Sequence, residues 1–386
     1  MYLHNLYLRS FRNYLEQEVN FTAQKTILVG NNAQGKSNLL EAVELLATLK
    51  SHRTSRDREF IFNGAKLGQI TANLERYHSK AELGIIFRLK GRKTVSLNQE
   101  NLRRQLDFLG VLNAVEFSSL DLDLVRGSPE YRRRWIDSLL IQLEPIYGKI
   151  LAEYERILRQ RNALLKQIRH LTQNSPNLSL NSQKINFATS QLQLWNEQLA
   201  EAGSRITRRR ARVIERLTPL AAKWHSKISG KTEKLEINYQ PNVIWQENTP
   251  EAVQKAFLAK ITSRRLAEQQ QGKTVVGTHR DEIELSINQT VARYYGSQGQ
   301  QRTLVLALKL AELELIEAVV GEPPLLLLDD VLAELDPQRQ HQLLEAIGDR
   351  FQTLITTTHI NAFDGNWLKS SQVLTVSAGK IIIPSN

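Results

Sequence analysis

The segment "TILVGNNAQGKSNLLEAV", residues 26–43, decides how the rest of the sequence is interpreted. A short apolar run is followed by a loop between Gly30 and Gly35, and then by apolar residues at intervals of three and four. The first pattern predicts a buried strand and the last predicts an amphipathic helix. Residues 30–37, GNNAQGKS, match the phosphate-loop pattern G-x-x-x-x-G-K-[ST] in the strand-to-helix context that the motif requires.

A loop of this kind binds phosphate because several backbone N–H groups and the dipole of a helix N-terminus converge on the anion. We expect ATP to bind here, with Lys36 reaching the β- and γ-phosphates and the Ser37 hydroxyl holding Mg²⁺. The ATP-binding residues predicted in the loop are Gly30, Asn31, Asn32, Ala33, Gln34, Gly35, Lys36 and Ser37. The alternative is a strand-turn-helix that matches the pattern by chance.

The segment "PLLLLDD", residues 324–330, supplies the carboxylates that such a site needs. Four consecutive leucines predict a strand buried on both faces, and it ends in Asp329 and Asp330. A phosphate loop holds Mg²⁺ together with a carboxylate at the end of a neighbouring strand. We expect Asp329 to take the metal, directly or through water, and Asp330 to orient or deprotonate the attacking water. The alternative is an acidic strand end that caps the next helix.

Composition narrows the class of protein. The 386-residue chain has no cysteine, which excludes disulfides and thiolate zinc sites. It has no apolar run of about 18 residues or more, so we predict no membrane span. The N-terminal residues "MYLHNLYLRSFRN" lack the apolar core that is typical of a signal peptide. We therefore expect a cytoplasmic protein.

The net charge of +11 is unevenly distributed along the chain. Residues 126–274 contain 26 Lys and Arg against 13 Asp and Glu, whereas the rest of the chain contains 25 against 27. A basic segment beside a nearly neutral one favours a polyanionic partner, with nucleic acid and anionic membrane as the usual candidates. The alternative is a solvated helical surface without a partner.

The spacing of apolar residues changes at both ends of this basic segment. Strand and helix patterns alternate before and after it, which predicts an α/β fold. Within it, long stretches at helical spacing flank the polar segment "TQNSPNLSLNSQ", residues 172–183, and predict an antiparallel helical arm. We predict a head formed by both ends of the chain, residues 1–125 plus 275–386, and an inserted basic arm domain, residues 126–274.

Three further motifs follow in a fixed order: "YGSQGQQRT" (295–303), "AELD" (333–336) and "TTTH" (356–359). With the phosphate loop and the aspartate pair, this order resembles the ATP-binding-cassette (ABC) superfamily. The resemblance implies that a signature loop closes on the nucleotide of a second protomer, in an ATP-dependent homodimer with two shared sites. It assigns Ser297, Gly299 and Gln300 to the signature, Asp336 to the D-loop, and catalytic roles to Lys36, Asp330 and His359. For His359 the alternative is a satisfied polar group at a strand end.

Lys36 and Ser297 are 261 residues apart, so the insertion is longer than in a transporter cassette and far shorter than in a chromosome-structure (SMC) ATPase. Several stretches, "FRNY" (11–14), "SHRTSRDREFI" (51–61), "LVRGSPEYRRRWID" (124–137) and "GTHRDEIEL" (277–285), resemble the RecF family of bacterial recombination mediators. That resemblance implies weak, DNA-stimulated ATP hydrolysis, clamping of double-stranded and gapped or junction DNA, and cooperation with RecR and RecO in loading RecA. It places the protein in DNA replication, repair and the SOS response.

The resemblance also implies a second contact with the nucleotide, and the sequence departs from the family pattern at several positions. In related heads the turn at Arg12 and Asn13 approaches the nucleotide, with strand-turn structure as the alternative. Asp330 stands where most cassettes have Glu, and Ser118-Ser119-Leu120 stands where the family tends to have Pro-Glu. No glutamine occupies the apparent Q-loop region, so its metal contact is unassigned.

Arginines that neutralise phosphates are the expected DNA contacts, because they bind without reading sequence. The candidates are Arg53, Arg56, Arg132, Arg133, Arg134, Arg208, Arg209, Arg210, Arg212, Arg264 and Arg265. Two other functions stay open. One is an ATP-switched scaffold of the SMC-like class that holds protein partners. The other is the nucleotide-binding subunit of a transporter, which the basic arm and the missing Q-loop glutamine disfavour.

Overall fold

The computed structural model describes residues 1–77, 79–173, 178–360, 363 and 365–382, and the side chains of 178–183, 334 and 366 lie outside the description. A central six-stranded sheet has the order β15-β14-β3-β13-β12-β8. Its strands are β3 (Lys25–Val29), β8 (Ala114–Ser118), β12 (Leu325–Asp329), β13 (Thr353–Thr357), β14 (Ser371–Ser377) and β15 (Lys380–Ile382). All neighbours pair in parallel except β14 and β15. The sheet thus combines strands from the two ends of the chain, with β3 lying between β14 and β13.

The leucine-rich strand β12 is buried on both faces, as its sequence predicts. Leu325 and Leu327 contribute to one hydrophobic core, and Leu326 and Leu328 contribute to the other. Successive side chains of a strand point to opposite faces, so four consecutive leucines satisfy two cores at once.

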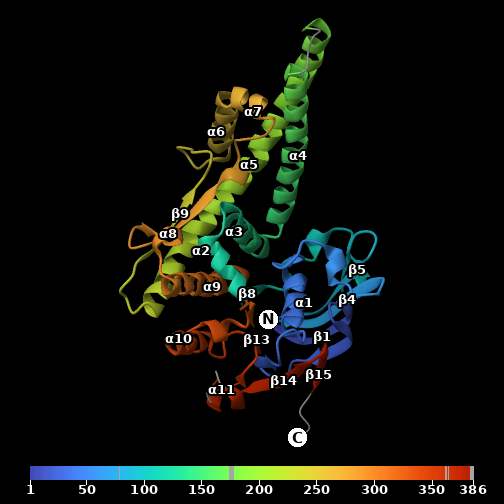
Figure 1. The fold of residues 1–386 in the computed structure, drawn as a ribbon, viewed down its shortest axis with the longest axis vertical. Helices are drawn as coiled ribbons and strands as arrows, with labels where there is room; N and C mark the ends of the chain where they lie inside the picture. The colour runs from blue at the N-terminus through green and yellow to red at the C-terminus, as the bar shows by residue number, and fades with distance from the viewer. Residues whose placement is uncertain (78, 174–177, 361–362, 364, 383–386) are drawn as a thin grey trace.

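One of these cores contains helix α1 (Lys36–Thr48), whose apolar side chains pack with residues of the central sheet and of a second, antiparallel sheet. The second sheet has the order β2-β1-β4-β5-β6-β7. Its strands are β1 (Tyr2–Phe11), β2 (Tyr14–Asn20), β4 (Leu67–Arg76), β5 (Ser79–Arg88), β6 (Thr94–Leu97) and β7 (Glu100–Asn101). The helix that follows the phosphate loop is therefore held between two sheets (Figure 1).

Two long antiparallel helices project away from the sheets (Figure 1). They are α4 (Ile146–Gln173) and α5 (Leu178–Ile228), which continues through Pro219. Residues 174–177 of the predicted polar turn lie outside the described residues, and α5 begins at Leu178, within the segment expected to be a turn. Beside this hairpin lie α6 (Pro250–Ser263) and α7 (Arg265–Gln271). The hydroxyl of Thr249 caps α6 by accepting from the amide of Ala252, as the Thr-Pro start predicts.

A small third sheet crosses the predicted boundary between head and arm. It consists of β9 (Leu235–Gln240), β10 (Glu282–Ile287) and β11 (Thr290–Val291), in the order β11-β10-β9. β9 lies before residue 274 and β10 after it, and the two pair antiparallel along their length. Backbone hydrogen bonds therefore cross the predicted division at 274/275. The division of the chain into a head and an arm domain stays a prediction.

Helix α9 (Gln298–Val320) is buried over most of its length and packs on α3, α5 and β8. The remaining α-helices are α2 (Asp123–Arg126), α3 (Pro129–Leu143), α8 (Ala292–Tyr295), α10 (Pro337–Ile347) and α11 (Gly365–Lys369). Single 3-10 turns occur at Asp57–Phe60, Gln105–Asp107, Ser119–Leu122, Thr278–Arg280 and Val331–Glu334. Across the residues that can be described, no helix combines the length and the apolar character that crossing a membrane requires.

A buried arginine connects the arm to the rest of the structure. Arg210 of α5 donates to both carboxylate oxygens of Asp137 in α3, at 2.9 and 2.8 Å, and to Asp281 Oδ2 at 2.9 Å. Its side chain is 3% exposed. Burying three charges costs free energy that only complete pairing offsets, so removing one partner leaves the others uncompensated.

We therefore expect Arg210→Met to lower the free energy of unfolding by about 3–5 kcal/mol, the cost typical of breaking a buried ion pair. The matched control is Arg212→Met on the same helix, where the side chain is 56% exposed. That change should alter stability by no more than about 0.5 kcal/mol. Urea unfolding followed by circular dichroism measures both, and equal effects would contradict the structural role of Arg210.

Candidate functional site

The phosphate loop lies between β14 and the turn that contains Asn13. A Cβ atom at Gly30 would lie 2.3 Å from the carbonyl oxygen of Val376, and a Cβ at Gly35 would lie 2.7 Å from the Asn13 side chain. Gly35 also has a φ of 115°, which favours glycine. Asn13 Nδ2 donates to the carbonyl of Gln34 at 2.9 Å. Gly30 is thus required by a close backbone contact and Gly35 by its backbone conformation. Asn13 touches the loop, and its predicted contact with the nucleotide stays a prediction.

Lys36 is folded back onto the loop. Its ammonium donates to the carbonyl oxygens of Gly30 at 2.8 Å and Asn31 at 3.1 Å, and the residue is 3% exposed. These are weak partners for an ammonium compared with a triphosphate, because hydrogen bonds between two charged groups are the stronger ones. The lysine is therefore held at the centre of the loop, where phosphate oxygens can replace the carbonyls.

Ser37 and the predicted metal carboxylate meet at the edge of the central sheet. Asp329 Oδ1 accepts from Ser37 Oγ at 2.7 Å and from Thr356 Oγ1 at 2.7 Å. They converge because β3, β13 and β12 are parallel, so the carboxyl ends of these strands lie at one edge. A hydroxyl and a carboxylate at this spacing are oxygen ligands of the kind that Mg²⁺ prefers. The residues present therefore fit the ion.

Asp330 has an unusual environment next to this pair. Its φ of 52° is left-handed, and its N–H donates to Thr356 Oγ1 at 2.9 Å. Its Oδ1 atom is buried and has no hydrogen-bond partner among the described residues. Burial raises the pKa of Asp330, the nearby Lys36 lowers it, and Asp329 raises it further, with a net increase above the ordinary value. A half-buried carboxylate with a raised pKa suits acceptance of a proton from water.

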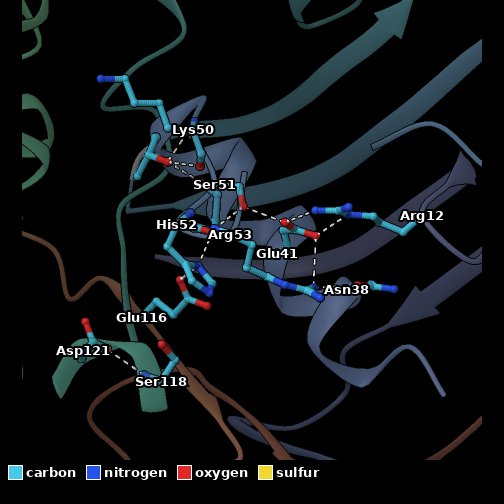
Figure 2. A network of polar contacts seen from close by, with 12 residues as sticks. Arg12, Asn38, Glu41, Lys50, Ser51, His52, Arg53, Glu116, Ser118 and Asp121 are labelled. Atoms are coloured by element: carbon cyan, nitrogen blue, oxygen red, sulfur yellow. Dashed lines mark hydrogen bonds and ion pairs between the residues drawn. The ribbon is translucent and has the colours of Figure 1, made fainter. Parts of the chain in front are cut away.

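A polar network surrounds the first turns of α1 (Figure 2). Arg12 binds the carboxylate of Glu41 with two bonds of 2.8 and 2.6 Å, and Glu41 is fully buried. Arg53 donates to Asn38 Oδ1 at 2.8 Å and lies 3.4 Å from Glu41 Oε2. Asn38 in turn donates to Asn13 Oδ1 at 2.8 Å. Direct contacts of Arg12 with ATP and of Arg53 with DNA stay predictions, since both side chains here bind α1.

Sequence reasoning missed Asn38 and Glu41, which organise this network. A charged residue within the apolar run "LLEAVELL" is the signal that points to Glu41, because a buried carboxylate requires a partner. For Asn38 we find no sequence signal beyond its position after Ser37.

The predicted signature residues form the start of α9. Ser297 is exposed and caps the helix: its Oγ accepts from the amide of Gln300 at 3.2 Å, and Gln300 Oε1 accepts from the amide of Ser297 at 2.8 Å. The side chain of Gln300 also donates to Glu233. Gly299 lies in the first turn of the same helix. An exposed N-terminus of a 23-residue helix presents amides and a positive dipole to an anion.

This end of α9 lies away from the phosphate loop of its own chain. Helix α8, which directly precedes Ser297, is well to the side of α1 in Figure 1. The geometry within one chain therefore does not bring the signature over its own nucleotide loop.

The two remaining motif residues are Asp336, directly before α10, and His359, just beyond β13. Asp336 caps α10 by accepting from the amide of Arg339 at 3.0 Å, and this bond is the main reason that the pKa of Asp336 lies below its ordinary value. Arg339 also binds Thr303 of α9 at 2.8 Å. His359 is exposed just beyond β13, and its amide donates to Thr357 Oγ1. Roles of Asp336 and His359 in ATP chemistry stay predictions.

Two predicted DNA contacts are wrong. Arg132 binds Glu282 at 2.7 and 2.8 Å and is 5% exposed at its side chain, and Arg210 is the buried residue described above. Consecutive residues of an α-helix point about 100° apart, so a run of three arginines cannot face one surface. Arg133, Arg208 and Arg209 are half-buried and bind Asp281, Asn248 and Glu144 respectively. The candidates that stay exposed are Arg53, Arg56, Arg134, Arg212, Arg264 and Arg265.

Comparison with known proteins identifies the family. The family model described as the RecF/RecN/SMC N terminal domain matches residues 2–380. The DNA replication and repair protein RecF of Gloeothece citriformis is 72% identical over 381 residues, 99% of each chain. The Synechocystis protein of the same name is 63% identical over 99% of this chain and 98% of its own. The chain belongs to the RecF family. Its predicted assignment to DNA replication and repair is thereby confirmed.

Solved structures agree with the RecF assignment. A structure of the recombination mediator protein RecF with ATP, in the RecFOR pathway, has a TM-score of 0.87 at 30% identity and covers 100% of this chain and 98% of its own. An Smc head domain of Pyrococcus furiosus matches with a TM-score of 0.53 at 16% identity, over 99% and 96% of the two chains, which shows the fold alone. The predicted fold class, an α/β ABC-type ATPase head with a helical insertion, is confirmed.

Proposed function

We propose that this RecF-type protein binds ATP and Mg²⁺, dimerises through them, and clamps gapped or junction DNA while it hydrolyses ATP slowly. With partners of the RecR and RecO type it would help to load RecA recombinase, in the cytoplasm. The observation that supports this best is the convergence of Ser37 and Thr356 on Asp329, next to Lys36. The RecF–ATP structure at 30% identity supports ATP as the nucleotide.

Each residue of the site has a defined task in this proposal. The loop amides and Lys36 bind the phosphates, and Ser37 with Asp329 holds Mg²⁺, which supplies charge neutralisation at the transferring phosphoryl group. Asp330 accepts the proton of the attacking water. Hydrolysis is slow when a monomer acts alone, because the donors of Ser297 and the first turn of α9 must come from a second copy. His359 senses the γ-phosphate at this interface.

Exposed arginines of the arm and head supply the DNA contacts. The exposed arginines within the basic segment 126–274 are Arg134 on α3, Arg212 on α5, Arg264 between α6 and α7, and Arg265 at the start of α7. Such side chains neutralise phosphates without reading bases, which suits recognition of DNA structure rather than sequence.

A pair of variants tests the shared ATP site. Lys36→Met removes charge-assisted bonds and should lower ATP affinity about tenfold or more, together with dimerisation and DNA binding. Ser297→Arg should leave ATP binding by the monomer intact and abolish ATP-dependent dimerisation, because only the second protomer uses this residue. Sedimentation velocity with and without ATP and Mg²⁺ measures dimerisation, and nucleotide fluorescence measures binding. Normal dimerisation of Ser297→Arg would contradict the shared site.

The protonation of Asp330 predicts a pH dependence. The residue acts as a base only when it has lost its proton, and its raised pKa moves this transition above the ordinary range of an aspartate. The hydrolysis rate should therefore rise with pH through that pKa and then level off. Asp330→Asn should lower the rate by about 100-fold or more, remove this rise and keep ATP binding. An unchanged pH profile in Asp330→Asn would exclude Asp330 as the base.

Salt dependence separates the DNA clamp from the alternative, an ATP-switched protein scaffold. A clamp should bind duplex DNA more tightly with ATP, and the logarithm of its affinity should fall steeply with the logarithm of salt concentration. Replacing Arg264 and Arg265 together with Gln should make that slope shallower, whereas Arg92→Gln on the antiparallel-sheet side of the chain serves as the matched exposed control. Affinity that depends on neither salt nor ATP would favour the scaffold.

A further inference from the structure

Helix α9 contains a buried lysine that pairs with one carboxylate outside the helix and one within it. The ammonium of Lys309 is 2.9 Å from Asp121 Oδ1 and 3.7 Å from Glu312 Oε1, and its side chain is 11% exposed. Burial alone lowers the pKa of Lys309, but the two carboxylates raise it above its ordinary value, so the group stays charged. A buried ammonium is tolerated only in complete pairing, which makes the contact with Asp121 an obligatory one.

Asp121 also binds the end of β8 beside the metal-site aspartate. It lies in the turn Ser119–Leu122, and its Oδ2 accepts from the amide of Ser118 at 2.7 Å (Figure 2). Ser118 in turn pairs in register with Asp329 on the neighbouring strand β12. One carboxylate thus connects the strand end at the nucleotide site with the helix that begins at the signature.

Through His52, β8 is also connected to α1. His52 Nδ1 lies 2.7 Å from Glu116 Oε2 of β8, a pair that Figure 2 shows. The same atom lies 2.9 Å from Glu44 Oε2 of α1. Strand β8 is therefore tied by ion pairs to the helix that follows the phosphate loop and, through Asp121, to the signature helix. A change in the position of α1 or of Asp329 has a direct physical route to α9.

Helix α9 packs directly on β8 and on the turn. A small, partly open pocket of about 20 Å³ remains between residues of β8, the turn, α9 and the segment before α10, with room for about one water molecule. Close-packed interiors transmit displacements because their atoms have no free volume into which to move. The turn also coincides with the segment where the sequence lacks a Q-loop glutamine.

We propose that Asp121 and Lys309 are a pair of positioning residues that couples Mg–ATP binding at the phosphate loop to the orientation of the signature helix α9. The pair takes the place of the missing glutamine contact by connecting the strand end next to Asp329 with α9. This inference rests on the proposed ATP-dependent dimerisation. It assigns no contact with ATP to either residue.

The test separates ATP binding from dimerisation. Lys309→Met and Asp121→Asn should each keep the ATP affinity of the monomer within about threefold and weaken ATP-driven dimerisation about tenfold, a loss within the usual range of coupling between sites. The double variant should lose no more than the single ones, because the two residues act as a unit. Lys309→Arg keeps the positive charge and should therefore dimerise like the wild type, in contrast to Lys309→Met. Nucleotide fluorescence, sedimentation velocity and urea unfolding are measured on the full chain.

Arg350→Met is the matched control, because it breaks another ion pair of α9, with Glu317, at 2.6 Å and far along the helix from the signature. It should leave dimerisation within about twofold, since it lies outside the proposed route. Asp121→Asn keeps an acceptor for the Ser118 amide and decides the question if Lys309→Met does not fold. Dimerisation like that of the wild type in folded Asp121→Asn would overturn the coupling. A wild type that stays monomeric with ATP would instead overturn the proposed function.

Discussion

The parallel pairing of β3, β13 and β12 joins the two ends of the chain, and the candidate site depends on it. Because these strands are parallel neighbours, the loop after β3 and the carboxylates after β12 share one edge of the sheet, where Ser37 donates a hydrogen bond to Asp329. The 126–274 segment is inserted between these strands in the sequence without interrupting the sheet. An insertion of this length is tolerated because loop closure costs little additional free energy as the connection grows.

Buried ion pairs determine how the inserted segment is attached. Arg210 links α5 to α3 and to Asp281, Arg132 links α3 to Glu282 at β10, and Arg161 links α4 to Glu268 in α7. Each of these arginines is nearly fully buried, so part of the basic excess of the segment serves its architecture rather than a partner. The positive charge that this segment leaves on the surface is accordingly smaller than the sequence count implies.

In the proposed function, each copy of the chain presents two half-sites. The phosphate loop, Asp329 and Asp330 are assembled at one edge of the central sheet, whereas the capped start of α9 is exposed elsewhere. Neither half has the complete set of donors that a triphosphate transition state requires. A second copy is the simplest source of the missing half, which explains why ATP would hold two protomers together and why DNA binding would respond to the nucleotide.

Much of the fold and part of the site were predictable from the sequence by itself. The phosphate loop, the doubly buried β12, the long helices of the arm and the Thr249 cap are encoded by local spacing, because each depends on residues within a few turns or strand positions. These predictions agree with the structure because the residues that specify each element are close together in the sequence. The position of Asp329 was predictable too, since a strand order typical of such loops brings it to the same edge.

Only the tertiary structure decided which charges are used internally. Arg132 and Arg210 look like their exposed neighbours in the sequence, yet they are buried because carboxylates at positions 282, 137 and 281 reach them across the fold. The pairing of β9 with β10, the Arg12–Glu41 pair and the contact between Asp121 and Lys309 are likewise long-range. Local patterns specify which element a segment forms. The partner of a buried charge depends on how those elements pack, and that information is distributed over the whole chain.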